Sequence, residues 1–469
     1  MMANVINFLF VWSSIFIATK CFDGDYDQPL FLSEFIDRGD YSSARNFSQV
    51  RHKEMEWLTS YAGYFTINRQ LGSNMFFWFF PAKCEASTAP LVLWLEGGPG
   101  TSSMLGLFRE NGPFLVDADG MLRPREYSWH LQHNLLYIDN PVGTGYSFTA
   151  YDAGYSKNQN DIGAHLYNVL QQFLLVFPEL RENPFYITGS SYGGKFALAL
   201  GHTILKNSPT FNSKNRINLQ GLAIGSGFID PVNMLNYGDI LYQNGMIDSN
   251  GLKIFKEYEK DMVECINKRD YAKALFHIDR LILNLLYKSD TVFTNLTGST
   301  NIYDAALTEK YDFTFIEDFL SRPDVKVAIH VGDVEFQSDQ FNNVDLREED
   351  RPVQFFLRRD IMQSVTGWLV ELLKHYKVFL FNGQTDIIGG YTLTENFLKQ
   401  LKFGGAEEYK EAERHIWKVD NEIAGYVKQA GRLTEIVVHN AGHYVGMDRP
   451  KWVLEMLTKL TSGKGFRFD

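Results

Sequence analysis

The strongest constraint on the fold is a set of apolar runs that each stop at a glycine-rich loop. These runs are "APLVLWLEGGPG", "NLLYIDNPVGTGYSF", "INLQGLAIGSGFIDP" and "YKVFLFNGQTDIIGG". A short apolar run that ends at glycine is typical of a strand buried on both faces. Segments such as "DIGAHLYNVLQQFLLVFPEL" carry apolar residues at helical spacing instead. Strands that alternate with helices predict an α/β fold, in which helices flank a mostly parallel central sheet.

Two regions depart from this alternation. The segment "GYFTINRQLGSNMFFWFF", which starts at Gly63, alternates apolar residues around a Leu-Gly-Ser-Asn turn and predicts a β-hairpin. From Val232 to Ser321 the chain is helical and charged, and it lacks a buried-strand pattern. We interpret this region as a helical cap inserted over the strand ends. The alternative is that it packs on an edge of the core.

The composition excludes several classes of protein. Of the 469 residues, 45% are hydrophobic and 22% are charged, which favours a sizeable packed core over disorder. The formal net charge of −11 is unsuited to nucleic-acid binding, which needs clustered lysine and arginine.

The first residues resemble an export signal. Val5 to Ala18 form an apolar run of the length of a signal-peptide core, too short for a comfortable membrane span, although no Lys or Arg precedes it. A buried core helix is the alternative. No later apolar stretch is long enough to cross a bilayer, so no stable span is expected after the signal is removed. Two glycosylation sequons, at Asn46 and Asn295, also favour the secretory pathway, with a secreted or lysosomal destination.

The segment "ITGSSYGGKF" fits two motifs at once. From Gly189 to Lys195 it is close to a phosphate-binding loop, but Phe196 stands where that loop needs Ser or Thr to hold Mg²⁺. From Gly189 to Gly193 it is G-x-S-x-G, the nucleophile elbow, whose strained turn needs small residues on both sides of the serine. We therefore predict that Ser191 is a nucleophile at a strand-to-helix turn.

Partners for this serine follow in the chain order that an elbow requires, serine then aspartate then histidine. Asp386 lies just after one apolar run, and His443 lies just after another. An imidazole there can accept the serine proton, while the carboxylate fixes the histidine tautomer and stabilises its charge. His439, four residues before His443, lies in or beside a strand and lacks a clear third ligand, so we predict no metal site.

Taken together, the motifs resemble those of the serine carboxypeptidases in order and spacing from Gly63 to the C-terminus. The matching stretches are "PLVLWLEGGPGTSSMLGLFRENGPF", "IDNPVGTGYSF", "ITGSSYGGKFALA", "IGSGFIDP", "NGQTDII" and "AGHYVGMDRP". Three more, "LTGSTNIYD", "VAIHVG" and "AGYVKQAG", are most similar to the vitellogenic carboxypeptidase-like branch. The resemblance implies an α/β-hydrolase fold with a helical insertion. It also implies removal of single residues from peptide C-termini, best at acidic pH and without a metal or cofactor.

The resemblance assigns roles to particular residues. Ser191 is the expected nucleophile, Asp386 the orienting acid and His443 the base. Gly98 and Tyr192 are expected to donate their backbone N–H groups to the oxyanion of the reaction. Such donors are typically worth about 2.7–4 kcal/mol each in the reaction barrier.

A family site for the substrate's terminal carboxylate maps to Glu96, Gly97, Glu110 and Ser190. The family usually has Asn in place of Glu96 and Glu in place of Ser190, so here a carboxyl group has moved from position 190 to position 96. Two close carboxyl groups do not both ionise easily, so at least one pKa is expected to rise. A protonated carboxyl donates a hydrogen bond to a carboxylate, whereas an ionised one repels it. The exchange therefore predicts either a free-acid site that works at acidic pH or a site that has lost its preference for free carboxylates.

Other departures concern a disulfide and the segment after His443. Thr101 stands where the family often has Cys, so a family disulfide is not expected. The chain has three cysteines, and whether Cys84 and Cys265 pair is left open. The family commonly has Met, Pro and Gln where this chain has, in order, Tyr444, Gly446 and Arg449.

We therefore expect a serine carboxypeptidase that acts on peptides or proteins, with no prediction of oligomeric state. The alternatives are a non-catalytic binding or storage protein and an acyltransferase or esterase on the same scaffold. The expected organisation is a signal peptide over 1–21 and a hydrolase core over 22–231 and 322–469, with the helical cap over 232–321.

Overall fold

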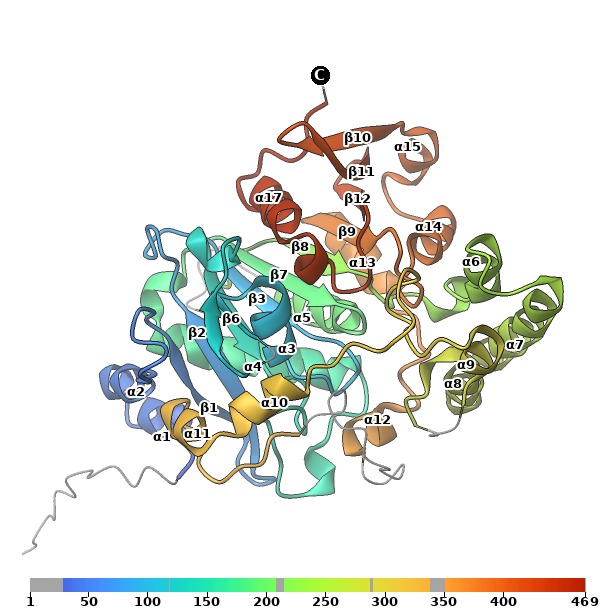
Figure 1. Cartoon of the computed structure of the whole chain (residues 1–469). Coiled ribbons are helices and arrows are strands. Elements are labelled where there is room, and N and C mark those ends of the chain that lie inside the picture. Colours follow the sequence, from blue (N-terminus) through green and yellow to red (C-terminus); the bar gives the residue numbers. More distant parts are fainter. Residues whose placement is uncertain (1–27, 118, 208–214, 287–289, 338–350, 469) are drawn as a thin grey trace, which may run out of the picture.

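The computed structural model describes residues 28–117, 119–207, 215–286, 290–337 and 351–468. Its central feature is a ten-stranded sheet in the order β1-β2-β6-β3-β7-β8-β9-β12-β11-β10 (Figure 1). Strands β4 and β5 form a separate two-stranded sheet. The strands are β1 Tyr61–Asn68, β2 Ser73–Phe80, β3 Leu91–Leu95, β4 Phe114–Val116, β5 Leu122–Pro124, β6 Asn134–Ile138, β7 Phe185–Ser190, β8 Leu219–Gly225, β9 Lys377–Gly383, β10 Arg414–Val419, β11 Glu422–Ala430 and β12 Leu433–Val438.

The middle of the large sheet is parallel, as the sequence predicts. β6, β3, β7, β8, β9 and β12 pair in parallel, and two antiparallel strands complete each edge. Each predicted apolar run forms one of these parallel strands. Parallel strands present all their carboxyl ends on one side of the sheet, so the glycine-rich loops that follow them gather on that side.

The predicted hairpin and an unpredicted one occupy the two edges. β1 and β2 pair antiparallel around a turn in which Gly72 has φ +59°, a conformation that favours glycine. At the other edge β10 and β11 also form a hairpin, which was not predicted from the sequence. Its turn residues, Asp420 and Asn421, both have positive φ. An Asp-Asn pair between alternating apolar residues is a two-residue hairpin signal that was available in the sequence.

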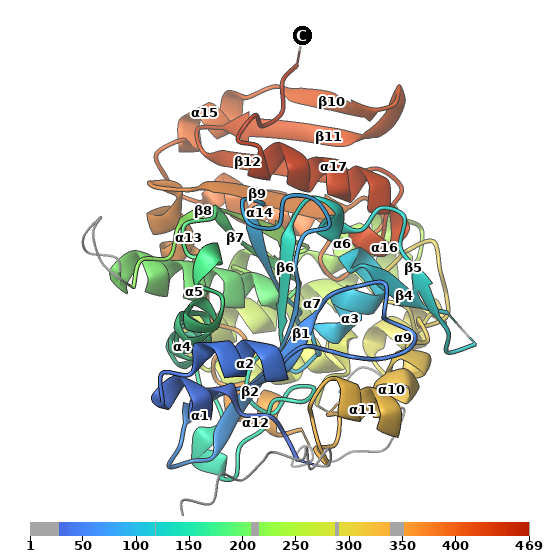
Figure 2. The same cartoon turned by 90° about the vertical axis from the view of Figure 1, so that its left-hand side faces the viewer.

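Helices cover both faces of the sheet (Figures 1 and 2). The side chains of β3 alternate between two apolar clusters, with Leu93 in one cluster and Val92 and Trp94 in the other. The first cluster includes α4, α5 and α13, and the second includes α17. The helices are α1 Leu32–Asp37, α2 Tyr41–Phe47, α3 Met104–Gly106, α4 Gln159–Val176, α5 Gly193–Asn207, α6 Tyr237–Gln243, α7 Ser249–Asn267, α8 Tyr271–Ile278, α9 Val292–Thr297, α10 Thr314–Ser321, α11 Pro323–Ala328, α12 Pro352–Leu357, α13 Thr366–Leu373, α14 Tyr391–Gln400, α15 Ala406–Glu411, α16 Val445–Asp448 and α17 Pro450–Thr461.

The region predicted to be a helical insertion carries α6 to α10, and its described residues contain no strand. Its later part contacts the loops at the carboxyl ends of β9 and β12. Ala305 N–H donates to Thr385 O at 2.8 Å, and Ile388 N–H donates to Ile302 O at 3.0 Å. His443 N–H donates to Tyr303 O at 2.8 Å. This part of the region therefore lies against the predicted catalytic loops.

Several expectations concern the surface and the termini. The predicted signal peptide and Cys21 lie outside the described residues. Within the described ranges, Cys84 is exposed, Cys265 is buried, and both are free thiols. Asn46 in α2 and Asn295 in α9 are both exposed. A search of the described helices finds none that is both long and apolar enough to cross a bilayer.

Candidate active site

Ser191 lies on a strained turn between β7 and α5, with φ +58°. A left-handed backbone is costly for a non-glycine residue and is characteristic of functional turns. The two flanking residues must be glycine, because there is no room for a side chain at either position. A Cβ on Gly189 would lie 2.4 Å from Gly193 O, and a Cβ on Gly193 would lie 2.3 Å from Leu95 O. The local geometry is therefore that of a nucleophile elbow.

The competing phosphate-loop interpretation fails at Lys195. Its ammonium is buried and donates to the backbone carbonyls of Ile361 at 2.7 Å and Gln363 at 2.5 Å. Burial lowers the pKa of Lys195 to about 8. A lysine with its donors committed inside the protein is not placed to reach a phosphate.

The predicted acid and base come together on adjacent strands. Asp386 follows β9 and His443 follows β12, and these strands pair in parallel up to Gly383 and Val438. His443 Nδ1 lies 2.8 Å from Asp386 Oδ2, and both side chains are buried. Burial lowers the pKa of His443, but the charge and hydrogen bond of Asp386 outweigh it and raise the pKa above its usual value. Such a pair suits a general base whose charged form must be stabilised.

Two residues to which the sequence analysis assigned no role hold the His443 loop. Gly442 directly precedes the histidine, and its N–H donates to Asp448 Oδ2 at 2.7 Å. On the other side, the Tyr303 ring centroid lies 5.3 Å from the imidazole centroid. Tyr303 comes from the region predicted as the insertion and lies in the "LTGSTNIYD" stretch, to which the sequence assigned no role at the site. The "AGHYVGMDRP" stretch contains Asp448, but its contact with the backbone of Gly442 is visible only in the fold.

The predicted oxyanion loop lies directly against the elbow. A Cβ on Gly97 would lie 2.8 Å from both Ser191 Cβ and Tyr192 N, so the loop approaches the elbow closely only because residue 97 is glycine. Gly98 has φ +103°, another conformation that favours glycine. The loop and the first turn of α5 thus bring Gly98 and Tyr192 to the same side of the sheet.

The two carboxyl groups predicted to bind the substrate are buried, and each has different partners. Glu96 accepts two hydrogen bonds, from Trp94 Nε1 at 3.1 Å and from Gly97 N–H at 3.3 Å. Burial raises the pKa of Glu96 to about 7, although these two bonds and the nearby charge of His443 oppose the shift.

Glu110, in the π-helix Leu107–Asn111, has one satisfied and one free oxygen. Gly446 N–H donates to Glu110 Oε2 at 3.2 Å, whereas Oε1 is buried without a hydrogen-bond partner among the described residues. Burial, followed by the charge of Glu96, raises the pKa of Glu110 well above its usual value. Asp448 adds to this shift, while the Gly446 bond and the charge of Arg125 oppose it.

The remaining predicted carboxylate-site residue, Ser190, ends β7 next to these groups. It is buried, and its carbonyl oxygen would lie 2.8 Å from a Cβ on Gly97. Thus the structure places all four residues predicted for this site around the elbow, and the moved carboxyl at position 96 faces Trp94 and Gly97.

One described trio of side chains has the spacing of a metal site, and it lies outside the predicted catalytic residues. His52, Glu54 and Asp324 offer ligand atoms within 4.8 Å of one another. Arg322 contacts both acids at 2.7 Å, and Glu54 N–H donates to His52 Nδ1. The hydrogen bonds of Asp324 with Arg322 and, to a smaller extent, with His52 hold the pKa of Asp324 well below its usual range, as in an ion-pair network.

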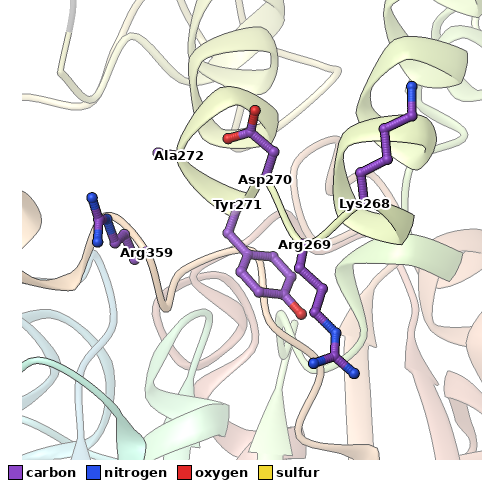
Figure 3. Close-up of a pocket in the computed structure, with 6 residues that line it drawn as sticks. All are labelled: Lys268, Arg269, Asp270, Tyr271, Ala272 and Arg359. Carbon is purple, nitrogen blue, oxygen red and sulfur yellow. The ribbon is translucent and has the colours of Figure 1, made fainter.

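A surface hollow of about 340 Å³ lies at the turn between α7 and α8 (Figure 3). None of the predicted catalytic residues lines it. The lining residues are Lys268, Arg269, Asp270, Tyr271, Ala272 and Arg359.

Comparison with known proteins agrees with this geometry. The family model described as serine carboxypeptidase matches residues 52–463. The venom serine carboxypeptidase of Apis mellifera is 47% identical over 441 residues, which are 93% of this chain and 92% of that protein. The vitellogenic carboxypeptidase of Aedes aegypti is 44% identical, over 93% of this chain and 91% of that protein. The probable serine carboxypeptidase CPVL of Homo sapiens is 41% identical, over 94% and 91%.

Among solved structures, a prohormone-processing carboxypeptidase of Saccharomyces cerevisiae, Kex1(delta)p, superposes with a TM-score of 0.76. The match covers 91% of this chain and 97% of that chain at 24% identity, and it shows a shared fold. The α/β-hydrolase fold expected from the sequence is thereby confirmed. Family model, relatives and fold agree, and this chain belongs to the serine carboxypeptidase family of hydrolases.

Proposed function

We propose that this protein releases C-terminal residues from peptides through an acyl-enzyme on Ser191. The observation that carries the proposal is the buried 2.8 Å contact between His443 and Asp386, together with a serine held at φ +58° on the elbow after β7. A hydrogen-bonded imidazole and carboxylate next to a strained nucleophile are the parts that acyl transfer needs.

In the proposed reaction Ser191 Oγ attacks the last peptide carbonyl and gives its proton to His443. The carbonyl becomes an oxyanion, which accepts hydrogen bonds from the N–H groups of Gly98 and Tyr192. The C–N bond then breaks, and His443 protonates the leaving amine. A water molecule repeats these steps on the ester, which releases the shortened peptide and restores Ser191.

The carboxyl pair grips the free carboxylate of the leaving residue. Glu110 is the member that keeps its proton, because its partnered oxygen accepts from Gly446 and its other oxygen is free to donate. Glu96 is the member that ionises first, because both of its oxygens already accept hydrogen bonds. The Gly446 donor depends on the departure from the family, since a proline there has no N–H.

This pair makes binding of free acids depend on pH. Below about pH 7 Glu96 is protonated, and the site is neutral beside an anionic substrate. As the pH rises through about 7 Glu96 becomes charged and repels the substrate carboxylate. Amide substrates carry no such charge, so their binding does not follow this titration. The proposed enzyme therefore prefers free acids at acidic pH and loses that preference in alkaline solution.

Two other functions compete with this proposal. A non-catalytic binding protein would have no physical need for the bonded pair of Asp386 and His443. An esterase or acyltransferase would use the same acyl-enzyme but would not need a protonated carboxyl such as Glu110 beside the leaving group. The buried Oε1 of Glu110, which has no hydrogen-bond partner in the described part of the chain, favours the carboxypeptidase.

The proposal is tested with one blocked dipeptide, prepared as its free acid and as its amide. Hydrolysis of each is measured at pH 5.5 and pH 8, with Ser191→Ala as the blank. We expect Ser191-dependent release of the last residue, with the free acid preferred at the lower pH. Absence of turnover of either form would favour a binding protein, and a preference for the amide at both pH values would favour the alternative hydrolases.

Entry to the secretory pathway and the organisation of the chain belong to the same proposal. We propose a signal peptide over 1–21, glycosylation at Asn46 and Asn295, and a cap over 232–321. The exposed positions of both asparagines support glycosylation, and the helices of the insertion support the cap. Expression in insect cells tests the first two points. Asn46→Gln and Asn295→Gln should each abolish one glycosidase-sensitive shift in mass of the secreted protein.

A further inference from the structure

The two proposed oxyanion donors come from different loops, and their spacing must be fixed. Gly98 follows β3 and Tyr192 follows β7, whereas both N–H groups must lie about 2.7–3.1 Å from one oxygen. The segment 351–363, which contains α12 and the turn after it, contacts both loops through side chains.

The first contact holds the Gly98 loop. Gln354 Nε2 donates to the carbonyl oxygen of Pro99 at 2.6 Å, and the Gln354 side chain is fully buried. Pro99 directly follows Gly98, which has φ +103° and, lacking a Cβ, can adopt more backbone conformations than other residues. A hydrogen bond to the next carbonyl therefore limits how the Gly98 peptide can rotate.

The second contact holds the elbow. The Tyr192 hydroxyl donates to Asp360 Oδ2 at 3.3 Å. Gln159 Nε2, at the start of α4, donates to the same carboxylate oxygen at 2.7 Å and to the Tyr192 hydroxyl at 3.0 Å. All three side chains are buried, so the bonds are shielded from water and fix the ring. The fixed ring in turn holds the backbone of Tyr192, which carries the proposed donor.

A third contact ties the same segment to the helix that follows Ser191. The buried ammonium of Lys195 donates to the carbonyls of Ile361 and Gln363, which lie just after Asp360. Because a buried lysine that loses such partners is strongly disfavoured, the contact resists separation of α5 from the segment. Both loops are thus attached to one stretch of thirteen residues.

We propose that segment 351–363 sets the spacing of the two oxyanion donors, with Gln354 and Asp360 as positioning residues. Each residue acts through a neighbour, Gln354 through Pro99 and Asp360 through Tyr192. The inference rests on the proposed acyl transfer at Ser191. It predicts that loss of the side-chain hydrogen bonds of Gln354 or Asp360 weakens binding of the transition state while leaving binding of substrate and product intact.

The test uses the full-length enzyme with Gln354→Met, which keeps the length of the side chain and removes the donor. Asp360→Asn is the second variant. Three quantities are measured for each: kcat and KM for the blocked dipeptide, Ki for a peptide aldehyde that adds to Ser191, and Ki for the peptide product. We expect kcat to fall about 10- to 100-fold with KM within about threefold, less than the loss for an oxyanion donor removed outright.

The aldehyde separates positioning from folding. Its adduct places an oxygen in the oxyanion hole, so its Ki should rise by the same factor as kcat/KM falls, while the Ki of the product stays constant. Gln363→Met is the matched control, because among the described residues the Gln363 side chain hydrogen-bonds to Arg359 O, within the same segment and away from both loops. It should change none of the three quantities.

Two results would overturn the inference. If both inhibitors weaken together, or if neither changes while the melting temperature falls, the segment only supports the fold. Should Gln354→Met prove insoluble, the aldehyde-to-product ratio of Asp360→Asn decides between the same outcomes. A wild-type enzyme without Ser191-dependent turnover overturns the proposed function together with the inference, whereas an active wild type with unchanged ratios overturns the inference alone.

Discussion

The asymmetry between Glu96 and Glu110 gives the sharpest prediction. Glu96→Gln removes the group that ionises near pH 7, and Glu110→Gln replaces the group that stays protonated. In the second variant the amide oxygen can still accept from Gly446 N–H, and the amide nitrogen can donate where Oε1 now lies. The two variants should therefore differ in pH dependence, although each removes one carboxyl.

The size of the effect follows from the charge on Glu96. Two unit charges about 5 Å apart repel by about 3 kcal/mol at an effective dielectric constant of about 20, which is a factor of about 100 in affinity. The wild-type preference for free acid over amide, taken as a ratio of kcat/KM values, should fall by up to about 100-fold from pH 5.5 to 8.5. The ratio cancels the titration of His443, which both substrates share.

Steady-state kinetics with the two substrates at five pH values tests this reasoning. In Glu96→Gln the ratio should stay within about threefold across the range, whereas in Glu110→Gln it should keep the wild-type slope. Glu435→Gln is a control, because burial raises the pKa of that carboxyl to about 7 as well, but it lies in β12 against Tyr409. A slope that survives in Glu96→Gln, or disappears in Glu110→Gln, refutes the assignment of the proton.

Three further predictions address the catalytic pair, stability and the elbow. Asp386→Asn should lower kcat by about 10³- to 10⁴-fold with little change in KM, because the histidine tautomer is lost; a drop below tenfold in stopped assays would contradict this role. The pKa of Glu96 is raised from 4.5 to about 7 in the folded chain. Between these two pH values the folded chain keeps a proton that the unfolded chain has released, so the free energy of unfolding should fall as the pH rises from 4.5 to about 7. This group contributes about 3 kcal/mol, and urea titrations should show a shallower decline in Glu96→Gln than in wild type. Gly193→Ala should destabilise by about 3 kcal/mol or more, since its Cβ would meet Leu95 O at 2.3 Å, while Gly404→Ala, with open space, should melt like wild type.

Features that depend on local pattern were predicted from the sequence. The parallel strands follow from apolar runs that stop at glycine, and the elbow follows from the spacing around Ser191. Ser191, Asp386 and His443 follow the parallel strands β7, β9 and β12, and parallel strands present their carboxyl ends on one side of the sheet.

Features that depend on contacts between distant segments were not predicted from the sequence. The bond between Gly446 and Glu110 joins residues 336 positions apart, and the bond between Gln354 and Pro99 joins residues 255 apart. No periodicity or spacing rule connects such pairs.

The main-chain bonds between residues 302–305 and the loops after β9 and β12 have a consequence for hydrogen exchange. The amides of His443, Ala305 and Ile388 are each closed by a partner across this junction. None of them can open alone without breaking the contact that holds the other two segments in place. Their protons should therefore exchange with solvent at one common rate, as a single cooperative unit, while the outer helices α7 and α8 exchange independently. His443 and the segment 302–305 would then lose their native positions in the same opening event.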